Sequence, residues 1–241
     1  MLDYYMISEK GDREINEDSI TCAVLNDDYA AFILADGLGG HGRGDEASSL
    51  AVKTAETVYK AHYKEENVME QMFEAAQQEV LRVQKEKGAR RSMKTTLNIL
   101  LLTPADIRIG HIGDSRTYYI NKGKIICRTH DHSVPQALVD LGDIPEKKIR
   151  NHPDRNRLLR VVGEEWTGLS YEIMDPVERK ADLSFLLCTD GFWELVDEKV
   201  MRKTLKHSHS AEEWARAMQD VVVNCKSEKN KDNYSVIAVR I

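Results

Sequence analysis

Four aspartates stand where an apolar segment meets a polar one, and their side chains could bind metal ions. Asp36 follows FILA, Asp114 follows IRIGHIG, Asp190 follows LSFLLCT, and Asp232 precedes NYSVIAV. Apolar segments of this length are typical of buried strands, and carboxylates at strand ends can converge on one edge of a sheet. Hard divalent cations such as Mg²⁺ and Mn²⁺ prefer oxygen ligands. The pattern therefore predicts a site for such cations.

Two of these aspartates are followed by glycine, in ADGLGGHG and CTDGF. Gly37 would let its backbone carbonyl approach an ion bound by Asp36 with no side chain in between. Plainer interpretations exist: Asp36 could cap a following helix, and Asp232 with Asn233 could form an Asx turn before the last strand. The repetition of the pattern of strand, Asp and Gly favours the metal site.

The N-terminal segment GDREINEDS adds a cationic side chain and further carboxylates. Arg13 could neutralise phosphoryl oxygens, because guanidinium stays charged and donates in a planar fork. Taken alone, Arg13 is more simply a solvated surface residue. Two cations about 3.5–4 Å apart can lower the pKa of a bridging water enough to make it a nucleophile, and His41 is the best-placed proton donor for a leaving alkoxide. These groups suit hydrolysis of a phosphate ester.

Composition limits the partners of the chain. Its 241 residues with 41% hydrophobic content predict one domain with a well-buried core. The formal charge is −6 and no basic block appears, so we expect no nucleic-acid partner. The N-terminus MLDYYMISEKGDRE lacks a signal-peptide pattern and no run reaches membrane-spanning length, so we expect no membrane partner. The four cysteines lack CxxC spacing, which predicts reduced thiols and a cytoplasmic protein.

The elements that would position the site alternate irregularly between strands and helices. Strands are predicted over residues 4–7, 20–25, 30–35, 96–103, 107–112, 117–120, 124–127, 170–174, 183–188 and 234–241. Helices are predicted over 45–63, 68–87, 197–206 and 211–224 from apolar residues at helical spacing. The stretch 129–163 is polar and receives no element. Along the sequence, groups of strands alternate with pairs of helices, and this order favours two sheets covered by helices.

The order of the motifs resembles that of the metal-dependent protein serine/threonine phosphatases, the type 2C family, in its compact bacterial form. The likeness covers nearly the whole chain. The matching motifs are R-x-x-N-E-D at 13–18, D-G-x-G-G-H at 36–41, a Thr pair at 95–96, GDSR at 113–116, DHS at 131–133, the segment 152–163, DG at 190–191 and DN at 232–233.

The resemblance implies an α+β fold, namely a four-layer αββα sandwich of two antiparallel β-sheets flanked by helix pairs, with a flap-like segment around 130–163. It also implies a two-metal centre for Mn²⁺ or Mg²⁺. In that centre Asp36 would bridge both ions, the Gly37 carbonyl would bind one, and Asp190 and Asp232 would bind the other.

The resemblance assigns further roles outside these ligands. Glu17 and Asp18 would hold metal-bound waters, and Asp114 would share a third, weaker ion with Asp190. Arg13 would grip the phosphate of the substrate. The implied activity is hydrolysis of phosphoserine and phosphothreonine in proteins, which would reverse the action of a cognate serine/threonine kinase.

Several alternatives stay open. Asp114 precedes Ser115 and Arg116, so it could be a turn or salt-bridge residue. The chain could also be a non-catalytic phosphoprotein-binding module on the same fold, or a phosphatase dedicated to one regulatory protein, such as an anti-sigma antagonist.

Three positions depart from the family pattern. Leu38 stands where eukaryotic relatives have His, Lys94 stands where many relatives have Gly, and Pro135 lies in the flap-like region. Outside the motifs, Cys188 is interpreted as a small core residue, and His207 and His209 as residues of a solvated loop.

Overall fold

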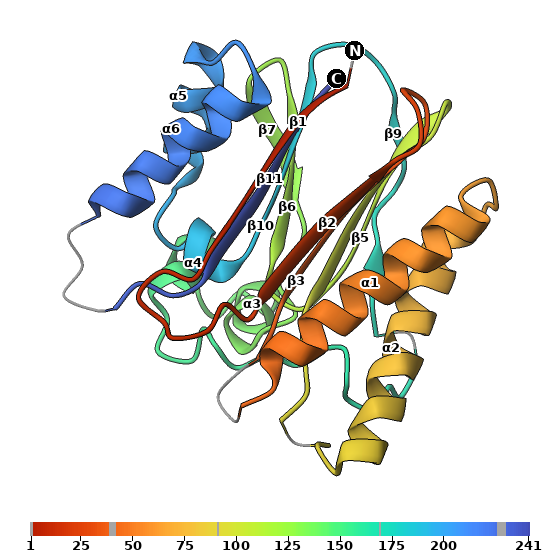
Figure 1. The fold of residues 1–241 in the computed structure, drawn as a ribbon. Coiled ribbons are helices and arrows are strands. Elements are labelled where there is room, and N and C mark those ends of the chain that lie inside the picture. The colour runs from red at the N-terminus through yellow and green to blue at the C-terminus, as the bar shows by residue number, and fades with distance from the viewer. Residues whose placement is uncertain (1, 39–41, 91, 169, 226–229) are drawn as a thin grey trace.

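The strands of this computed structural model form two antiparallel sheets that lie face to face between two layers of helices (Figure 1). The structure describes residues 2–38, 42–90, 92–168, 170–225 and 230–241. The predicted α+β sandwich with helices on both outer faces is confirmed, and what matters for function is where each strand ends.

The first sheet carries the later part of the chain. Its strands are β1 (Asp3–Glu9), β6 (Arg116–Asn121), β7 (Lys124–Arg128), β10 (Leu183–Cys188) and β11 (Tyr234–Arg240), in the order β1-β11-β10-β6-β7. Its outer face packs against α4 (Asp190–Trp193), α5 (Glu198–His207) and α6 (Ala211–Asn224). In Figure 1 both termini lie at the end of this sheet opposite α4.

The second sheet carries the earlier part of the chain. Its strands are β2 (Asp18–Val24), β3 (Ala30–Asp36), β4 (Leu97–Leu102), β5 (Asp106–Ile112) and β8 (Glu172–Ile173), in the order β2-β3-β4-β5-β8, and β9 (Val177–Glu178) also pairs with β5. The long helices α1 (Gly44–His62) and α2 (Val68–Lys87) cover its outer face.

Strand β3 shows why the central strands are continuously apolar. Phe32 and Leu34 pack between the two sheets, whereas Ala31, Ile33 and Ala35 pack against the layer of α1 and α2. Both faces of the strand are therefore buried, and a strand buried on both faces does not alternate polar and apolar residues. Asp36 is the first residue of the strand that is not buried, so the carboxylate lies where the core ends.

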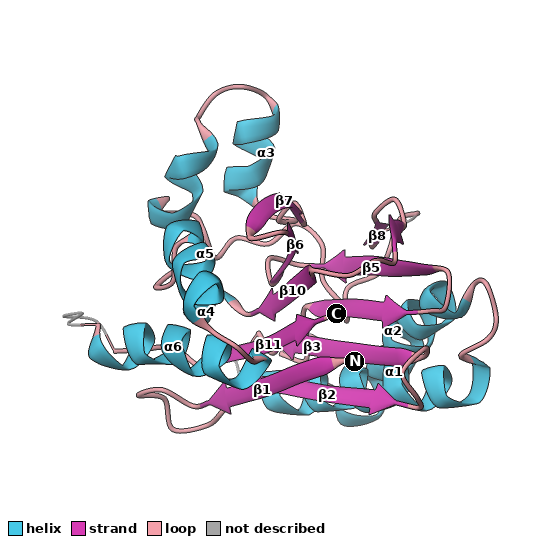
Figure 2. Cartoon of the chain, turned by 90° about the horizontal axis from the view of Figure 1, so that it is seen from above, coloured by secondary structure: helices cyan, strands magenta, loops and turns pink. Residues whose placement is uncertain are grey.

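The segment 129–163 differs from the prediction, because it contains two short helices. These are α3 (Val134–Asp140) and the 3-10 helix η1 (Glu146–Asn151). The Ser133 side chain accepts a hydrogen bond from the Gln136 N–H at the start of α3, and Pro135 lies in the first turn, where a missing N–H costs nothing. Both helices are too short to show a clear apolar period. In Figure 2 α3 and α5 lie on the side of β6 and β7, away from α1 and α2.

Helix ends elsewhere agree with the prediction within one or two residues. The predicted strand over 170–174 is only the two-residue β8, and His207 ends α5 rather than lying in a loop. None of the helices in the described ranges has the length and apolar character needed to span a membrane.

Candidate metal centre

Most of the predicted site residues line one cavity of about 480 Å³. The cavity lies where β3 and β10, one strand from each sheet, come to an end. The predicted residues on its wall are Arg13, Glu17, Asp36, Gly37, Asp114, Asp190 and Asp232. Asp18 is buried and does not line the cavity. His41 lies outside the described residues, so its role stays a prediction.

The backbone of Asp36 is fixed by the threonine pair of the next strand. Its N–H donates to Thr96 Oγ1 (2.9 Å), and its carbonyl accepts from Thr95 Oγ1 (2.8 Å) and from the Thr96 N–H (2.9 Å). Helix α1 has Arg43 at its N-cap position and no side-chain cap. The interpretation of Asp36 as a helix cap is therefore wrong, and its carboxylate is left to face the cavity.

Both glycines of the DG pairs are needed for close packing of the backbone. A Cβ on Gly37 would lie 2.2 Å from the Gly44 carbonyl oxygen, and a Cβ on Gly191 would lie 2.0 Å from the Asn233 carbonyl oxygen. On the sequence alone, Gly37 is expected to let an ion approach the backbone. The structure gives an additional reason, since each glycine lets a second chain segment pass directly behind an aspartate.

Asp18 and Asp36 are direct neighbours across strands β2 and β3. Thr189 Oγ1 donates to Asp18 Oδ2 at 3.0 Å, and Thr189 precedes Asp190. Asp18 Oδ1 is buried and has no hydrogen-bond partner among the described residues. Asp190 and Asp36 line the same cavity, and the Asp190 carboxylate repels that of Asp36. Three carboxylates, two from neighbouring strands and one from the start of α4, are thus brought together at the edge of the core.

The carboxylates of this cluster are hard to ionise without a cation. Burial, followed by repulsion from neighbouring carboxylates, raises the pKa of Asp18 and the pKa of Asp190 to about 7. The same causes raise the pKa of Asp36 and the pKa of Asp114 well above their ordinary range. An oxygen-rich cluster with an unpartnered lone pair and a deficit of positive charge is what hard divalent cations require. The residues present therefore fit Mn²⁺ or Mg²⁺.

The charge balance of the cavity wall supports the same conclusion. Among the described residues that line the cavity, two are basic, Arg13 and Lys94, and six are acidic, namely Glu17, Asp36, Asp114, Glu164, Asp190 and Asp232. Lys94 is already paired with Glu164. Bound cations would offset the remaining negative charge.

Asp114 is held by a buried network that leaves its carboxylate outside any salt bridge found in the described part of the chain. Arg116 donates to both oxygens of Asp131, at 2.9 and 2.7 Å, and its guanidinium lies 3.6 Å from the centre of the Trp193 ring. Trp193 Nε1 donates in turn to the Asp114 carbonyl at 3.0 Å. Arg116 therefore forms its salt bridge with Asp131, and the interpretation of Asp114 as a salt-bridge residue is not supported.

Arg13 lies at the mouth of the cavity and forms an ion pair with a predicted metal ligand. Its Nη2 is 2.7 Å from Asp232 Oδ2, and the two side chains are 57% and 42% exposed. To bind a phosphate as predicted, the Arg13 guanidinium would have to leave this carboxylate at least in part. Exposure of both groups makes such a rearrangement inexpensive.

Asn233 is a positioning residue whose role the sequence analysis did not identify. Its Nδ2 donates to the carbonyls of Lys10 (2.8 Å) and Ile15 (2.9 Å), and its Oδ1 accepts from the Glu17 N–H (2.9 Å). This amide ties the N-terminal loop to the C-terminal strand. The Glu17 carboxylate packs against the start of α1, where a Cβ on Gly44 would lie 2.9 Å from Glu17 Oε1, and burial raises the pKa of Glu17. The signal in the sequence was the DN pair, interpreted there as an Asx turn or a ligand.

The segment 152–163 also contributes to the cavity. Asn156, Leu158 and Val161 line it, together with Leu38, whose N–H donates to the Lys94 carbonyl at 2.9 Å. Lys94 and Leu38, two of the departures from the family pattern, are therefore both part of the wall.

A second cluster, formed by His111, His132 and Glu172, has ligand atoms within 4.8 Å of one another. Its imidazoles are stacked, with ring centroids 4.6 Å apart and planes 18° apart, so their in-plane lone pairs do not converge on one ion. The Gly113 N–H donates to His132 Nδ1 (3.2 Å), which leaves the ring proton on Nε2. Burial lowers the pKa of His132 to about 3. This arrangement does not fit a metal ion.

Outside the cavity, the expected core position of Cys188 is confirmed. Cys188 is fully buried and burial raises its pKa, which excludes a thiolate nucleophile. Trp193 and Trp214 are buried, and Trp214 Nε1 donates to the Met201 carbonyl. None of these residues competes with the carboxylate cluster as a reactive site.

Comparison with known proteins agrees with this geometry. The family model of protein phosphatase 2C matches residues 8–226. The chain is 31% identical over 234 residues to the serine/threonine phosphatase stp of Listeria welshimeri, covering 94% of this chain and 90% of that protein. It is 28% identical over 228 residues to the serine/threonine protein phosphatase PstP of Mycobacterium tuberculosis, covering 91% of this chain and 42% of that longer protein.

Solved structures show the same fold. The serine/threonine phosphatase Stp1 from Staphylococcus aureus superposes with a TM-score of 0.87 at 26% identity, covering 100% of this chain and 95% of the other. The catalytic domain of PstP in complex with two manganese ions has a TM-score of 0.82 at 25% identity, covering 99% and 97%. The chain belongs to the protein phosphatase 2C family.

Proposed function

We propose that the chain is a Mn²⁺- or Mg²⁺-dependent phosphatase acting on phosphoserine and phosphothreonine in proteins. The observation that carries this proposal is the cluster of buried and half-buried carboxylates at the end of β3 and β10, with raised pKa values and an unpartnered oxygen on Asp18. Membership of the protein phosphatase 2C family supports protein serine/threonine dephosphorylation and does not favour a non-catalytic binding module.

The proposed ligands are the Asp36 carboxylate, the Gly37 carbonyl, and the carboxylates of Asp190 and Asp232. Two ions at this position would supply positive charge for the phosphoryl group and a water of lowered pKa. We assign to Asp18 and Glu17 the holding of waters beside the ions, and to Asp114 a share in a third, weaker site. The PstP catalytic domain with two manganese ions supports the ion type.

Substrate binding is assigned to Arg13. Its guanidinium is 57% exposed and lies on the cavity wall, so it can reach a phosphate that enters from solvent. A planar fork of donors suits two phosphoryl oxygens at once. His41 remains the proposed proton donor to the leaving serine or threonine oxygen, because an imidazole can give that proton and Leu38 stands where eukaryotic relatives have His. A metal-bound water is the alternative donor.

Three broader proposals follow. Residues 1–241 would form one catalytic unit in which the segment 130–163 borders the substrate entrance, as its contribution of Asn156 and Leu158 to the wall supports. A cognate serine/threonine kinase would supply the phosphorylated substrates. The free cysteines, which are Cys22, Cys127, Cys188 and Cys225, support a reducing, cytoplasmic location.

The test is turnover of p-nitrophenyl phosphate and of a phosphothreonine peptide by the purified protein. We expect turnover with Mn²⁺, none after treatment with EDTA, and recovery when Mn²⁺ is restored. A binding module would retain the phosphopeptide without releasing phosphate. Equal rates with and without EDTA would contradict metal dependence.

A further inference from the structure

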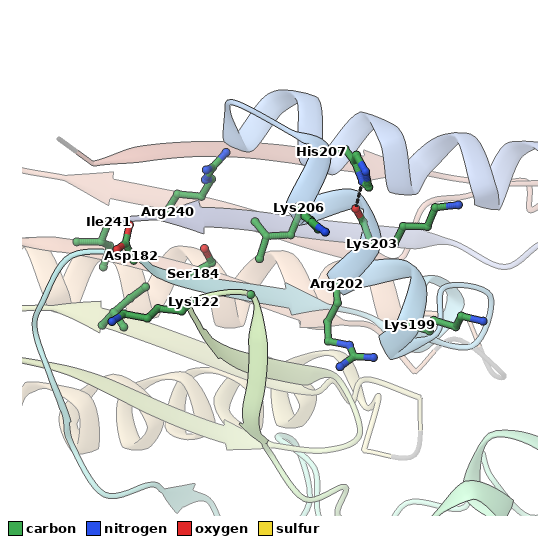
Figure 3. A pocket seen from close by; sticks show the side chains of 13 residues that line it. Lys122, Asp182, Ser184, Lys199, Arg202, Lys203, Lys206, His207, Arg240 and Ile241 are labelled. Atoms are coloured by element: carbon green, nitrogen blue, oxygen red, sulfur yellow. Dashed lines mark hydrogen bonds between the residues drawn. The ribbon is translucent and has the colours of Figure 1, made fainter.

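A second cavity, of about 780 Å³, is shown in Figure 3. It lies at the opposite end of the first sheet from the metal centre. It is lined by the turn between β6 and β7, by the start of β10, by the end of β11 and by helix α5. Strand β10 runs from Leu183 and Ser184, which line this cavity, to Cys188, two residues before Asp190. At about 3.3 Å per residue, the two sites are separated by roughly 20 Å.

The cavity is strongly basic on a chain whose formal charge is −6. Its basic lining residues are Lys122, Lys199, Arg202, Lys203, Lys206, His207 and Arg240, and Asp182 is the one acidic residue among the described residues that line it. Lys122, Lys199, Arg202, Lys203 and Lys206 form no salt bridge within the described ranges. Most of the local positive charge is therefore available to a ligand.

The arrangement of the charges indicates the shape of that ligand. Lys199, Arg202, Lys203 and Lys206 follow the spacing i, i+3, i+4 and i+7, so they form one stripe along about 10 Å of α5. All four are exposed, and in Figure 3 their side chains do not converge on one point. A stripe of separated cations fits an extended chain of negative charges better than a single phosphate ion.

The remaining lining residues favour a peptide over a nucleic acid. Leu183, Leu205 and Ile241 give the cavity an apolar part, and no Trp, Tyr or Phe is present among its described lining residues for a base to stack on. The net negative charge of the whole chain would repel a long nucleic acid. The carboxylates of an acidic peptide would pair with the cations of the stripe on α5. Apolar side chains of the same peptide would pack against the apolar part of the cavity.

We propose that this basic cavity binds an acidic segment of the phosphoprotein substrate. This inference rests on the proposed function, because it adds a remote docking site to the same phosphatase. Since the two sites are about 20 Å apart and an extended residue spans about 3.3–3.6 Å, the acidic segment must lie at least about six residues from the phosphorylated residue. Docking at this distance lowers KM through a raised local concentration and leaves the chemical step unchanged.

Direct binding tests the cavity without any use of activity. The probe is fluorescein-labelled hexaglutamate, followed by fluorescence anisotropy with the full chain at low ionic strength. The test variant is Lys199→Gln/Lys203→Gln/Lys206→Gln, whose positions are exposed, so the fold is retained. The matched control is Lys53→Gln/Lys64→Gln/Lys85→Gln, which removes the same charge from exposed positions on and beside α1 and α2.

We expect the test variant to bind the probe roughly 10-fold or more weakly and the control variant to bind it within about two-fold of the original chain. Equal weakening in both variants would show a net-charge effect and overturn the site. Absence of probe binding to the original chain would also overturn it. Inorganic pyrophosphate and hexathymidylate are tested as competitors at the concentration at which unlabelled hexaglutamate displaces the probe. Displacement by either one would show that the cavity binds a small anion or a nucleic acid, and it would overturn the peptide proposal.

Kinetics test the link to catalysis. Two phosphothreonine peptides are compared, one with six glutamates placed eight residues from the phosphothreonine and one with six glutamines there. We expect a several-fold lower KM for the glutamate peptide, lost in the test variant, with kcat and p-nitrophenyl phosphate turnover unchanged. Equal KM values for the two peptides would overturn substrate docking. Absence of turnover on every substrate would instead contradict the proposed function, and the binding measurement would still decide the cavity.

Discussion

The two ends of strand β10 carry opposite charges in opposite environments. At its C-terminal end, Asp190 is half-buried among other carboxylates, and burial raises its pKa to about 7. At its N-terminal end, the cations of α5 are exposed to water and form no salt bridge within the described chain. Buried like charges raise the free energy of the fold unless a ligand offsets them, whereas exposed like charges are screened by water and salt.

This difference indicates two kinds of binding. The buried end needs its ligand, because the carboxylates are under-compensated without cations, and binding there is coupled to stability and to protonation. The exposed end tolerates an empty cavity and would bind a polyanion weakly and with strong dependence on salt. The first arrangement suits a resident cofactor, and the second suits a transient partner.

The largest expected effect comes from Asp190→Asn, which removes one carboxylate and keeps the shape of the side chain. We expect kcat on phosphothreonine peptide to fall by roughly 10³-fold or more, because a proposed ligand is lost. Calorimetric titration should show weaker Mn²⁺ binding, while hexaglutamate binding at the far end of β10 is unchanged. Turnover and Mn²⁺ affinity near those of the original chain would contradict the ligand assignment.

Asp114→Ala separates the proposed third site from the two tight ones. If Asp114 holds only a weaker ion, calorimetry should still show the tight Mn²⁺ sites, and kcat should fall by roughly 10- to 100-fold. Loss of tight binding would make Asp114 a ligand of the main centre. Full activity across a Mn²⁺ titration would return Asp114 to a structural role.

Arg13→Ala tests the ion pair between Arg13 and Asp232. We expect KM for phosphopeptide to rise by roughly 10-fold, because a fixed positive charge at the cavity mouth is lost. Mn²⁺ affinity should stay equal or increase, since Asp232 loses a competing cation. Arg13→Lys, which keeps the charge without the fork, should be intermediate in KM. An unchanged KM for Arg13→Ala would contradict substrate binding by Arg13 and show that it is an ordinary charged surface residue.

The smallest expected effect is on the stability of the metal-free protein. The raised pKa of Asp18 and Asp190 means that the folded state binds more protons than the unfolded state between about pH 4 and pH 7. Stability should therefore fall as pH rises through this window, with Tm in EDTA roughly 5 °C or more lower at pH 8 than at pH 5. Mn²⁺, or Asp190→Asn in EDTA, should reduce the difference. A Tm in EDTA that rises over this window would contradict the electrostatic assignment.

The carboxylate end could be predicted from the sequence because each aspartate sits beside a long apolar run. Asp36, Asp114 and Asp190 follow strands, and the order of the motifs pointed to one family and one fold. The sequence could not supply the contacts behind these residues. That Gly191 packs on the Asn233 carbonyl, or that Arg116 pairs with Asp131 rather than with Asp114, depends on segments that meet only in the folded chain.

The basic cavity could not be predicted from the sequence, and the reason is physical. Its charges come from a turn at Lys122, from helix α5 and from Arg240 at the end of the last strand. No continuous basic block results, and the stripe on α5 is interrupted by Val200, Met201 and Leu205. The helices of the segment 129–163 were missed because each is too short to display a helical period.

The most direct measurement is anomalous diffraction at the manganese edge from crystals soaked in Mn²⁺. We expect two strong peaks in the cavity lined by Asp36, Gly37, Asp190 and Asp232, and their loss in crystals of Asp190→Asn. A chain without peaks in that cavity, or with its main peak between His111, His132 and Glu172, would contradict the assignment of the carboxylate cluster as the metal centre.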